Sequence, residues 1–547
     1  LDDLYYSYGY YFGKIHVTPS NVDRIYIYGV PMLTSSDGGE TFTTLDAPNA
    51  HVDHHALWIN PSNPKHLING NDGGVNISYD GGENWMKSNQ PSVGQFYTVY
   101  ADEQTPYHVY GGLQDNGVWE AAHTSRESVA WQQSGHNNWT GIMGGDGMQI
   151  QVDKNNANIV YTGYQFGNYF RINRETKKRT YIQPKHKLGE APLRFNWQTP
   201  ILLSPHNNDI LYFGSNKLHR SLNRGDEWTT ISEDLTKGAK EGNVPYGTLS
   251  AIDESRFHFG HLVVGSDDGQ IHLTTDGGSA WQRISDDLPQ DLWVSRVQFS
   301  KHNESRIYAT LNGYRWDDFK AYIYSSDDYG KNWRSISNNL SLSAVNVIRE
   351  DHTNEDILYV GTDNGLFVSI DQGENWQMFD ADFPRVAVHD LFVQERDNDL
   401  LVGTHGRSIY LLELEAVQEL PTVTNKAVAV LAPKPQKHKT SWGQKRRTWD
   451  DAKTPDFWFT FFAKNPTVGT WHLVSDKNVV LFEEEVELAK GLQQVSYDLV
   501  IQQKALKKYS RKHKTEVKPA DDGRVYLPKG SYQLLWNDEP QTTLKIE

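Results

Sequence analysis

Six copies of one short pattern constrain the fold of this chain more than any other feature of its sequence. The pattern reads Ser/Thr-x-Asp/Asn-x-Gly-x-x-Trp/Phe, and its copies are TSSDGGETF (34–42), ISYDGGENW (77–85), RSLNRGDEW (220–228), LTTDGGSAW (273–281), SSDDYGKNW (325–333) and VSIDQGENW (368–376). Each copy has the chemistry of a hairpin corner, because Asp or Asn accepts hydrogen bonds from turn amides and Gly supplies a positive φ. The closing aromatic residue is placed to plug the adjacent core. We therefore expect a tight turn between two strands at each copy.

A second turn signal precedes the corner pattern and defines a longer repeat. The stretches GNDGGVNIS (70–78), GSDDGQIHLT (265–274) and GTDNGLFVSI (361–370) each read as an Asp-x-Gly turn between two strands. The first two corner patterns are 43 residues apart, as are the last two, which matches the ~40–50-residue period of propeller blades. Units without the corner pattern lie around 109–119, 159–170 and 399–414. The sequence therefore predicts nine blade-like units, each a small antiparallel sheet.

Composition supports a β-rich protein and excludes several kinds of site. The 547 residues include 17 Trp, 29 Tyr and 44 Gly, a mixture that suits many short strands joined by tight turns. The absence of Cys excludes disulfides, thiolate metal sites and a cysteine nucleophile. No apolar run approaches the ~18 residues of a membrane-spanning helix. The sequence begins LDDLYYSYGYYFG, with neither Met nor a signal peptide, so we expect a mature or cleaved product.

Charge is unevenly distributed along the chain. The net charge is −16, yet residues 421–547 carry 21 Lys and Arg against 15 Asp and Glu. A long acidic body argues against nucleic acid as the main partner, because phosphates need neutralising cations. The basic patches KPQKHKTSWGQKRR and KALKKYSRKHK are expected to be solvated faces rather than docking sites. The second patch is also expected to form a short helix.

The repeated pattern is the Asp-box (BNR) signature, and the chain resembles the bacterial BNR-repeat "glycosyl hydrolase / sortilin N-terminal domain-like" β-propeller family. The resemblance covers about residues 15–415 and rests on DHHALWINP, GNDGGVNIS, GGLQDNG, GGDG and the closing GTHGRSIYLL. A more distant likeness connects the chain with tandem-propeller xyloglucanases. The resemblance implies an extracytoplasmic protein, either secreted, periplasmic or attached to the cell surface.

Repeats and resemblance together predict an all-β protein with three parts. Residues 1–90 are expected to be the last blades of an N-terminal propeller, completed by a missing N-terminal segment or a second chain; the alternative is a single large ring that begins with them. Residues 91–415 are expected to form the main Asp-box propeller of seven or eight blades. Residues 416–547 read as the alternating strands of a C-terminal Ig- or FlgD-like β-sandwich.

Candidate site residues lie at the end of the propeller opposite the Asp-boxes, where propeller ligands usually bind. The Asp-x-Gly turns contribute a ring of Asp72, Asp115, Gln165, Asn216, Asp267, Asp363 and His405. Aligning VDHHALWIN with GDGMQIQVD places Asp53 on Asp146, and Trp197 and Trp293 take the same position in later units. Carboxylates beside indoles suit sugar recognition. The candidate ligand-binding residues are His51, His54, His55, Asp72, Gln114, Asp115, Trp197, Trp293, His405 and Arg407.

Two functions of different classes follow from these residues. In the first, the protein engages carbohydrate, and its catalytic form is a glycoside hydrolase in which Asp53 and Asp146 are the paired carboxylates, with Asp72 and Asp115 as alternates. The second is a non-catalytic, sortilin-like propeller scaffold that binds a peptide or a protein. A metal site of His51, Asp53 and His55 is a minority hypothesis. No other cofactor is expected, except a structural Ca²⁺ at Asp-rich turns.

Overall fold

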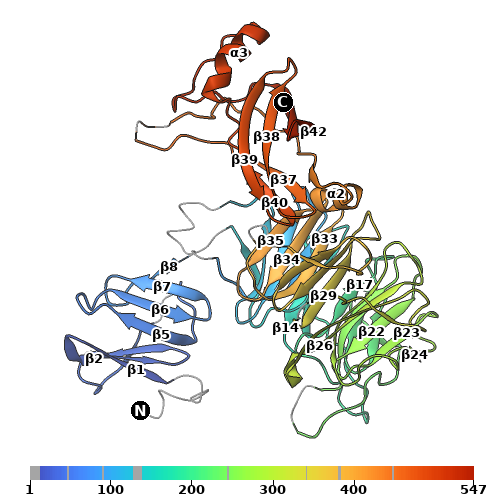
Figure 1. Ribbon diagram of the computed structural model, residues 1–547. Helices are drawn as coiled ribbons and strands as arrows, with labels where there is room; N and C mark the ends of the chain where they lie inside the picture. The colour runs from blue at the N-terminus through green and yellow to red at the C-terminus, as the bar shows by residue number, and fades with distance from the viewer. Residues whose placement is uncertain are drawn as a thin grey trace. The chain divides into compact units, whose positions relative to one another are not determined.

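The computed structural model describes residues 13–45, 49–88, 92–126, 138–242, 246–340, 342–379, 383–445, 447 and 449–547 (Figure 1). The chain divides into two compact units. One contains the residues up to Trp376 together with Pro384–Leu412, and the other contains Gln377–Phe383 and Glu413–Glu547. Among the described residues, no helix combines the length and apolar character needed to cross a membrane.

Two four-stranded antiparallel sheets begin the first unit (Figure 1). They are β1 (Lys14–Thr18), β2 (Asn21–Tyr28), β3 (Met32–Ser35) and β4 (Thr43–Thr44), and then β5 (His54–Ile59), β6 (Leu67–Asn71), β7 (Gly74–Ser78) and β8 (Met86–Ser88). Tyr26, Tyr28 and Trp85 form a small buried core between them. Other apolar side chains stay in contact with solvent, among them Ile15, Val22 and Trp58. That these sheets belong to a second propeller, completed by further blades, stays a prediction.

Seven consecutive sheets follow in the described residues, and their strands are joined in sequence order. The first three sheets are β9 (Phe96–Ala101), β10 (His108–Leu113), β11 (Gly117–Ala122) and β12 (Thr140–Met143); β13 (Gln151–Val152), β14 (Ile159–Tyr164), β15 (Asn168–Asn173) and β16 (Arg179–Tyr181); β17 (Ile201–Leu203), β18 (Leu211–Gly214), β19 (Leu218–Ser221) and β20 (Thr229–Thr230). The next two are β21 (Leu249–Glu254), β22 (Leu262–Ser266), β23 (Ile271–Thr274) and β24 (Gln282–Arg283); β25 (Trp293–Phe299), β26 (Ile307–Gly313), β27 (Asp318–Ser326) and β28 (Arg334–Ser335). The last two are β29 (Val345–Glu350), β30 (Leu358–Thr362), β31 (Gly365–Ser369) and β32 (Gln377–Met378); β33 (Val388–Gln394), β34 (Asp399–Thr404) and β35 (Ile409–Glu413).

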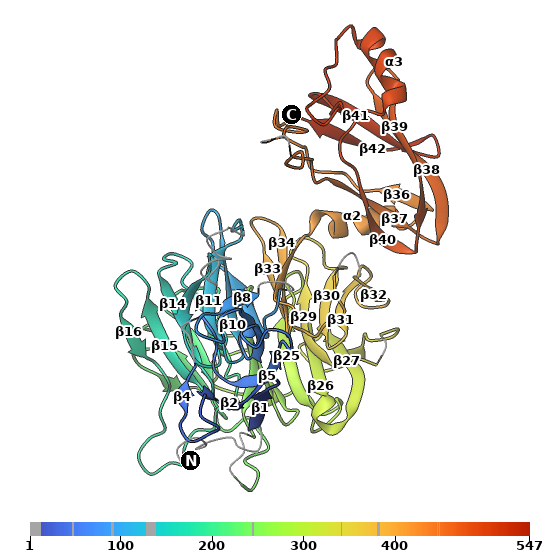
Figure 2. The ribbon, with the colours of Figure 1, turned by 90° about the vertical axis from the view of Figure 1, so that its left-hand side faces the viewer.

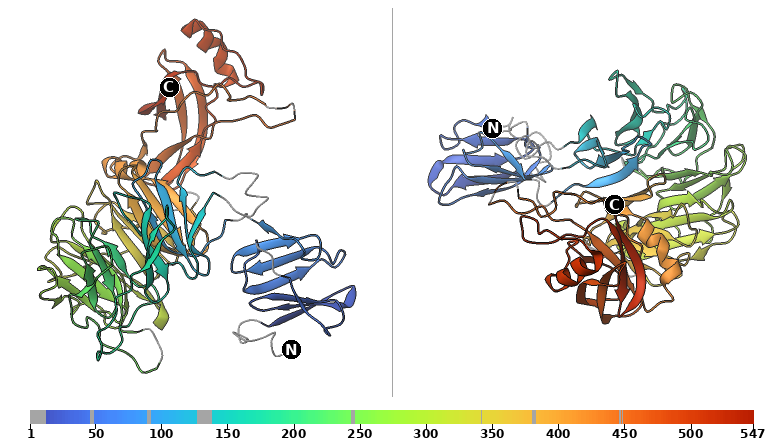
Figure 3. Two further views of the ribbon diagram at one scale, coloured as in Figure 1. Left: turned by 180° about the vertical axis from the view of Figure 1, so that it is seen from behind. Right: turned by 90° about the horizontal axis from the view of Figure 1, so that it is seen from above.

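These seven sheets form a closed ring, because the last sheet packs against the first (Figure 3). Thr98 Oγ1 of β9 donates a hydrogen bond of 2.9 Å to Asp390 Oδ2 of β33. The Tyr107 hydroxyl donates one of 2.8 Å to Asp399 Oδ2 of β34. The ring thus closes without the two N-terminal sheets, which overturns the alternative of a single large ring. The all-β propeller fold is confirmed.

Neighbouring blades are joined along their first strands by side chains that accept backbone N–H groups. The Leu203 amide donates to Gln151 Oε1 at 3.1 Å, and the Phe299 amide donates to Asp253 Oδ2 at 2.7 Å. Such bonds satisfy amides that no strand partner reaches, because the first strand of each blade is an edge strand.

The six Asp-box copies occupy the turns between the third and fourth strands, as predicted. In the last copy Ser369 Oγ donates to Asp371 Oδ1 at 2.8 Å and accepts the Gly373 amide at 2.8 Å. Gly373 has a φ of +85°, and a Cβ there would lie 2.8 Å from Ile336 Cβ, so both conformation and space require glycine. Trp376 Nε1 donates to Ile336 O of the preceding blade at 2.6 Å. The box therefore fastens one blade to the next.

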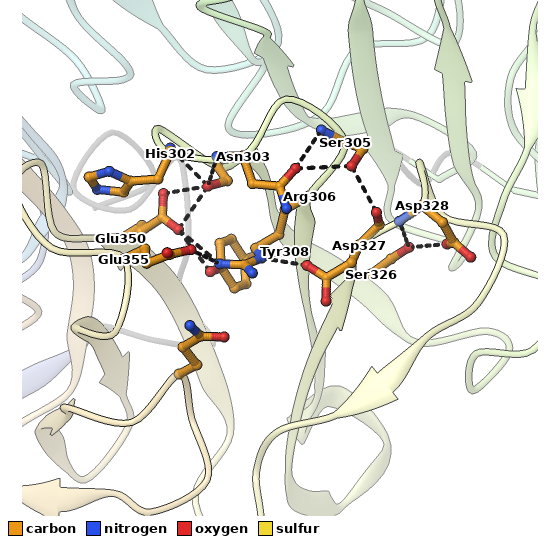
Figure 4. Close-up of polar contacts among 12 residues, drawn as sticks. His302, Asn303, Ser305, Arg306, Tyr308, Ser326, Asp327, Asp328, Glu350 and Glu355 are labelled. Carbon is orange, nitrogen blue, oxygen red and sulfur yellow. Dashed lines mark hydrogen bonds and ion pairs between the residues drawn. The ribbon is translucent and has the colours of Figure 1, made fainter.

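A polar network reinforces the same end of the ring (Figure 4). Arg306 Nη1 donates to Glu355 Oε2 at 3.0 Å, and the Tyr308 hydroxyl donates to Glu350 Oε1 at 2.9 Å. Glu350 is fully buried and also accepts hydrogen bonds from Ser300. These residues connect two neighbouring blades, so their charges are explained by blade packing.

The C-terminal unit contains two antiparallel sheets that share one core (Figure 2). The sheets are β36 (Val428–Val430), β37 (Trp458–Ala463) and β40 (Gly491–Ser496), and β38 (Thr467–Ser475), β39 (Val480–Leu488), β41 (Gly530–Trp536) and β42 (Glu539–Ile546). Helices α2 (Glu415–Val423) and α3 (Gln503–His513) complete the unit. The short helix predicted for the second basic patch is therefore present. The Ig- or FlgD-like relationship stays a prediction.

Candidate functional site

Turns between the second and third strands line the end of the ring opposite the Asp-boxes. In four blades one backbone amide of this turn donates to the carbonyl that precedes the first strand of the same blade. These amides belong to Gln114, Asp267, Asp363 and His405, at 2.8 to 3.0 Å. The hydrogen bonds correct the predicted ring by one residue, because Gln114 rather than Asp115 is the equivalent of Asp267. Asp115 follows it in a left-handed conformation, with a φ of 59°.

Asp115 and Asp146 are brought together at the junction between the first two blades of the ring. The Asp115 amide donates to Asp146 Oδ1 at 3.0 Å. Burial, together with the negative charges of Asp72 and Asp146, raises the pKa of the Asp115 carboxyl to about 6. The Asp115 carboxyl is therefore still protonated in mildly acidic solution, below a pH of about 6.

Tyr97 connects the acidic pair to an indole. Its hydroxyl donates to Gln114 Oε1 at 3.0 Å. Burial raises the pKa of Tyr97 above its usual value, while the side chain of Trp197 lowers it and the charge of Asp146 raises it. Trp197 is partly buried and packs edge-to-face on Phe166, with 5.2 Å between ring centroids. Trp197 also packs against the apolar cluster of its blade, so one part of the indole belongs to the core.

Two histidines continue the rim beyond Tyr97. His405 stacks on His389, with 4.3 Å between ring centroids, and lies 5.5 Å from the Tyr97 ring. Burial lowers the pKa of His389 to about 3 and also lowers that of His405. Both imidazoles are therefore uncharged at neutral pH, and they offer flat polar surfaces rather than cations.

Arg315 lies against the Trp293 ring and was not among the predicted site residues. The guanidinium carbon of Arg315 lies 4.1 Å from the Trp293 ring centroid and 4.6 Å from that of Tyr314. Its positive charge also lowers the pKa of His389. We use the name mouth for Tyr97, Gln114, Asp115, Asp146, Trp197, Trp293, Arg315, His389 and His405.

The HVDHH stretch does not form the predicted site. Asp53 has a φ of 63°, and β5 starts only at His54. The chain is therefore not extended there, so His51, Asp53 and His55 do not lie on one face of a strand, as a metal site of these three residues would need. His54 is 1% exposed and hydrogen bonds with Asn69, so it lies inside the sheet pair and is no ligand contact.

The remaining residues of this stretch make local contacts. His55 Nε2 lies 2.8 Å from Asp72 Oδ1, and His51 Nε2 lies 3.1 Å from Asp115 O. Burial raises the pKa of Asp53, and Asp72 raises it further. Within the described ranges, no group of three His, Asp or Glu side chains is arranged to hold a metal ion. The metal hypothesis therefore finds no geometric support.

Some residues of the mouth escaped prediction for identifiable reasons. Arg315 lies in the 3-10 helix η2 (Tyr314–Trp316), which replaces the Asp-x-Gly turn of its blade. A blade that lacks its expected turn was the signal that could have found it. Tyr97 is an inner-strand residue whose position depends on ring closure, so the local sequence gave no signal. Arg407 donates its amide to Thr404, and no contact connects it with the mouth in the described part of the chain.

Comparisons with known proteins give one partial family match and several similar solved structures. Residues 321–499 match the family described as "Sortilin, neurotensin receptor 3". A search of curated proteins found no significant match. Similar solved structures include a GH74 enzyme of Niastella koreensis, at 14% identity over 73% of this chain and 76% of that chain, with a TM-score of 0.25. A second is YCF48 from Cyanidioschyzon merolae, at 13% identity over 58% of this chain and 94% of that chain, with a TM-score of 0.34. A third is the extracellular domain of a putative hybrid two-component system from B. thetaiotaomicron, at 10% identity over 97% of this chain and 69% of that chain, with a TM-score of 0.43.

The chain is therefore a β-propeller protein. More specifically, it is a β-propeller whose residues 321–499 resemble the sortilin family.

Proposed function

We propose that the mouth binds carbohydrate. The observation that carries the proposal is the convergence of indole faces with hydrogen-bonding acids and amides at one end of the ring. Trp293 and Trp197 are partly exposed there. Trp197, Asp115 and Asp146 all act on the hydroxyl of Tyr97, and the Asp115 amide contacts the Asp146 carboxylate. Sugars need this combination, because their C–H faces stack on aromatic rings while their hydroxyls bond to carboxylates and amides.

The proposal extends to catalysis, in which the mouth hydrolyses a glycosidic bond of the carbohydrate that it binds. Asp115 takes the role of general acid, because its pKa of about 6 keeps it protonated in mildly acidic solution. Asp146 is the second carboxylate, which activates water or attacks the sugar. This pair replaces Asp53 and Asp146, since Asp115 is the acid that contacts Asp146 through its backbone.

A location outside the cytoplasm accompanies the proposal. Its support is the set of motifs that the chain shares with extracytoplasmic propeller proteins.

A panel of neutral and acidic oligosaccharides tests binding, with titration followed by isothermal calorimetry. Trp293→Ala and Trp197→Ala are expected to weaken binding at least tenfold. Trp449→Ala is the matched control, because Trp449 is 77% exposed and lies in the C-terminal unit. Equal affinity in all four proteins would place the sugar elsewhere and refute the proposal.

Peptide binding at the same mouth is the second candidate function. The match of residues 321–499 to a family named for a receptor favours it. The same titration with random-sequence peptides distinguishes the two, because the carbohydrate proposal expects no response that depends on Trp293.

A further inference from the structure

The turn between β26 and β27 differs from its counterparts in the ring. Three of its counterparts are Asp-x-Gly turns, whereas here η2 intervenes and Asp317 closes the turn with a φ of 57°. The segment presents three exposed aromatic side chains, namely Tyr314 at 42%, Trp316 at 44% and Phe319 at 49% exposure. A soluble protein rarely gathers exposed aromatic rings on one short segment without a binding role.

Arg315 stands among these rings without an acidic partner. In the portion of the chain that the structure describes, no carboxylate oxygen lies within 4.0 Å of its guanidinium nitrogens. The carboxylates whose charges reach it are those of Asp267 and Asp363. Both are already engaged, since Asp267 accepts hydrogen bonds from Thr248 and Asp363 accepts one from Asn346.

Six other arginines of the ring, each buried or partly buried, are paired with carboxylates. The pairs are Arg171–Asp226, Arg174–Glu120, Arg194–Asp234, Arg296–Asp390, Arg306–Asp327 and Arg349–Asp390. Arg315 is exposed to solvent, and the groups packed around it displace enough water to lower its pKa. Arg315 thus differs from these six arginines in being exposed, stacked on aromatic rings and not paired with a carboxylate within the described residues.

We propose that Arg315, held between Trp293 and Tyr314, binds the carboxylate of an acidic sugar unit, so that the ligand of the mouth is a uronate-containing oligosaccharide. The guanidinium fork matches a carboxylate bidentately, and stacking on two rings fixes its plane. The indole of Trp293 can then support the pyranose face beside the carboxylate. This inference rests on the proposed carbohydrate function and names its substrate class.

The test compares oligogalacturonate, oligomannuronate and oligoglucuronate with their neutral counterparts of equal length. Dissociation constants are measured by calorimetry for the wild-type protein and for Arg315→Met, Arg315→Lys and Arg334→Met. The last is the matched control, because Arg334 is an exposed arginine at the Asp-box end, paired with Glu374. Thermal unfolding of each variant shows whether it is folded.

We expect at least one acidic oligosaccharide to bind the wild-type protein tenfold or more tightly than its neutral counterpart. Arg315→Met should abolish this preference. Arg315→Lys should retain only part of it, because the charge remains and the fork is lost. Arg334→Met should keep the full preference.

Three results would overturn the inference in distinguishable ways. Neutral sugars that bind as tightly as acidic ones would refute the acidic substrate class and leave the carbohydrate function standing. A preference that survives in Arg315→Met would refute the role of this residue. No binding of any sugar, together with an Arg315-dependent response to peptides with a free but not an amidated C-terminal carboxylate, would refute the carbohydrate function itself.

Discussion

The backbone amide of Asp115 donates a 3.0 Å hydrogen bond to the carboxylate of Asp146, from the turn of one blade to the connection entering the next. A second bond, from the Gly147 amide to Leu113 O at 2.8 Å, holds the same two segments together. The acidic pair therefore sits on doubly anchored backbone, as a catalytic constellation requires.

Substitution of the acidic pair tests the hydrolytic form of the proposal. Asp115→Asn and Asp146→Asn should each lower kcat by a factor on the order of 10² or more, which is typical for loss of a general acid or base, while KM changes little. Reducing-sugar release from a bound oligosaccharide measures this. Asp291→Asn is the matched control, because Asp291 is exposed and also has a left-handed φ, of 64°.

The pH profile of the same reaction gives an independent readout. Because Asp115 must donate a proton, activity should fall as pH rises through the pKa of about 6. Undiminished turnover in either variant, or a profile without this alkaline limb, would refute the roles of the two carboxylates.

Asp253 should make stability depend on pH. Burial raises its pKa from 3.8 to about 7. The folded protein then keeps a proton that the unfolded chain releases, so the free energy of unfolding falls as pH rises from about 4 to about 7, by up to about 4 kcal/mol for a shift of this size. Asp253→Asn keeps the acceptor for the Phe299 amide and removes the charge.

Thermal unfolding between pH 5 and 8 measures the effect. The midpoint should fall more steeply for the wild-type protein than for Asp253→Asn. Parallel pH dependences in the two proteins would show that Asp253 does not titrate in this range.

The Asp-box indoles should contribute to stability through their N–H groups. Trp376→Phe removes the 2.6 Å bond to Ile336 O and leaves a buried carbonyl unsatisfied, which should cost about 1–3 kcal/mol. Urea denaturation followed by circular dichroism measures the loss. The control Trp449→Phe, at an exposed position, should change the free energy of unfolding by less than about 0.5 kcal/mol. An equal loss of stability in both variants would show that the Trp376 bond to Ile336 does not fasten one blade to the next.

Asp390 should be the most sensitive residue of the ring closure. Its carboxylate pairs with Arg296 at 2.9 Å and Arg349 at 3.3 Å, and it accepts Thr98 from the first blade. Asp390→Asn leaves two poorly hydrated guanidinium groups without a counter-charge, which should cost about 3–5 kcal/mol. Asp397→Asn, at a more exposed position on the same blade, should cost little in the same denaturation assay. Similar stability in the two variants would contradict this view of the closure.

The blade architecture could be predicted because its turns depend on contacts between residues that are close in the sequence. Each Asp-box needs Ser or Thr, Asp or Asn, and Gly at fixed offsets to close one turn, as Ser369, Asp371 and Gly373 do. Such patterns survive in a single sequence because the contacts lie within a few residues of one another. The same logic found Asp115 and Asp146, which belong to turns and connections that repeat from blade to blade.

The rest of the site depends on contacts that no local pattern records. Residues two apart in HVDHH would share a face only in an extended strand, and the left-handed conformation of Asp53 ends that possibility before His54. Arg315 was missed because its blade departs from the repeat that guided the alignment. Tyr97 and His389 reach the mouth only through ring closure, which joins segments about 290 residues apart.

Hydrogen–deuterium exchange with and without a bound oligosaccharide tests the carbohydrate-binding mouth most directly. We predict slower exchange in the peptides that cover residues 95–98, 113–117, 145–148, 312–316 and 403–407, with unchanged exchange at the Asp-box turns and in the C-terminal unit. Protection confined to the Asp-box end or to the C-terminal unit, with the mouth unaffected, would contradict it.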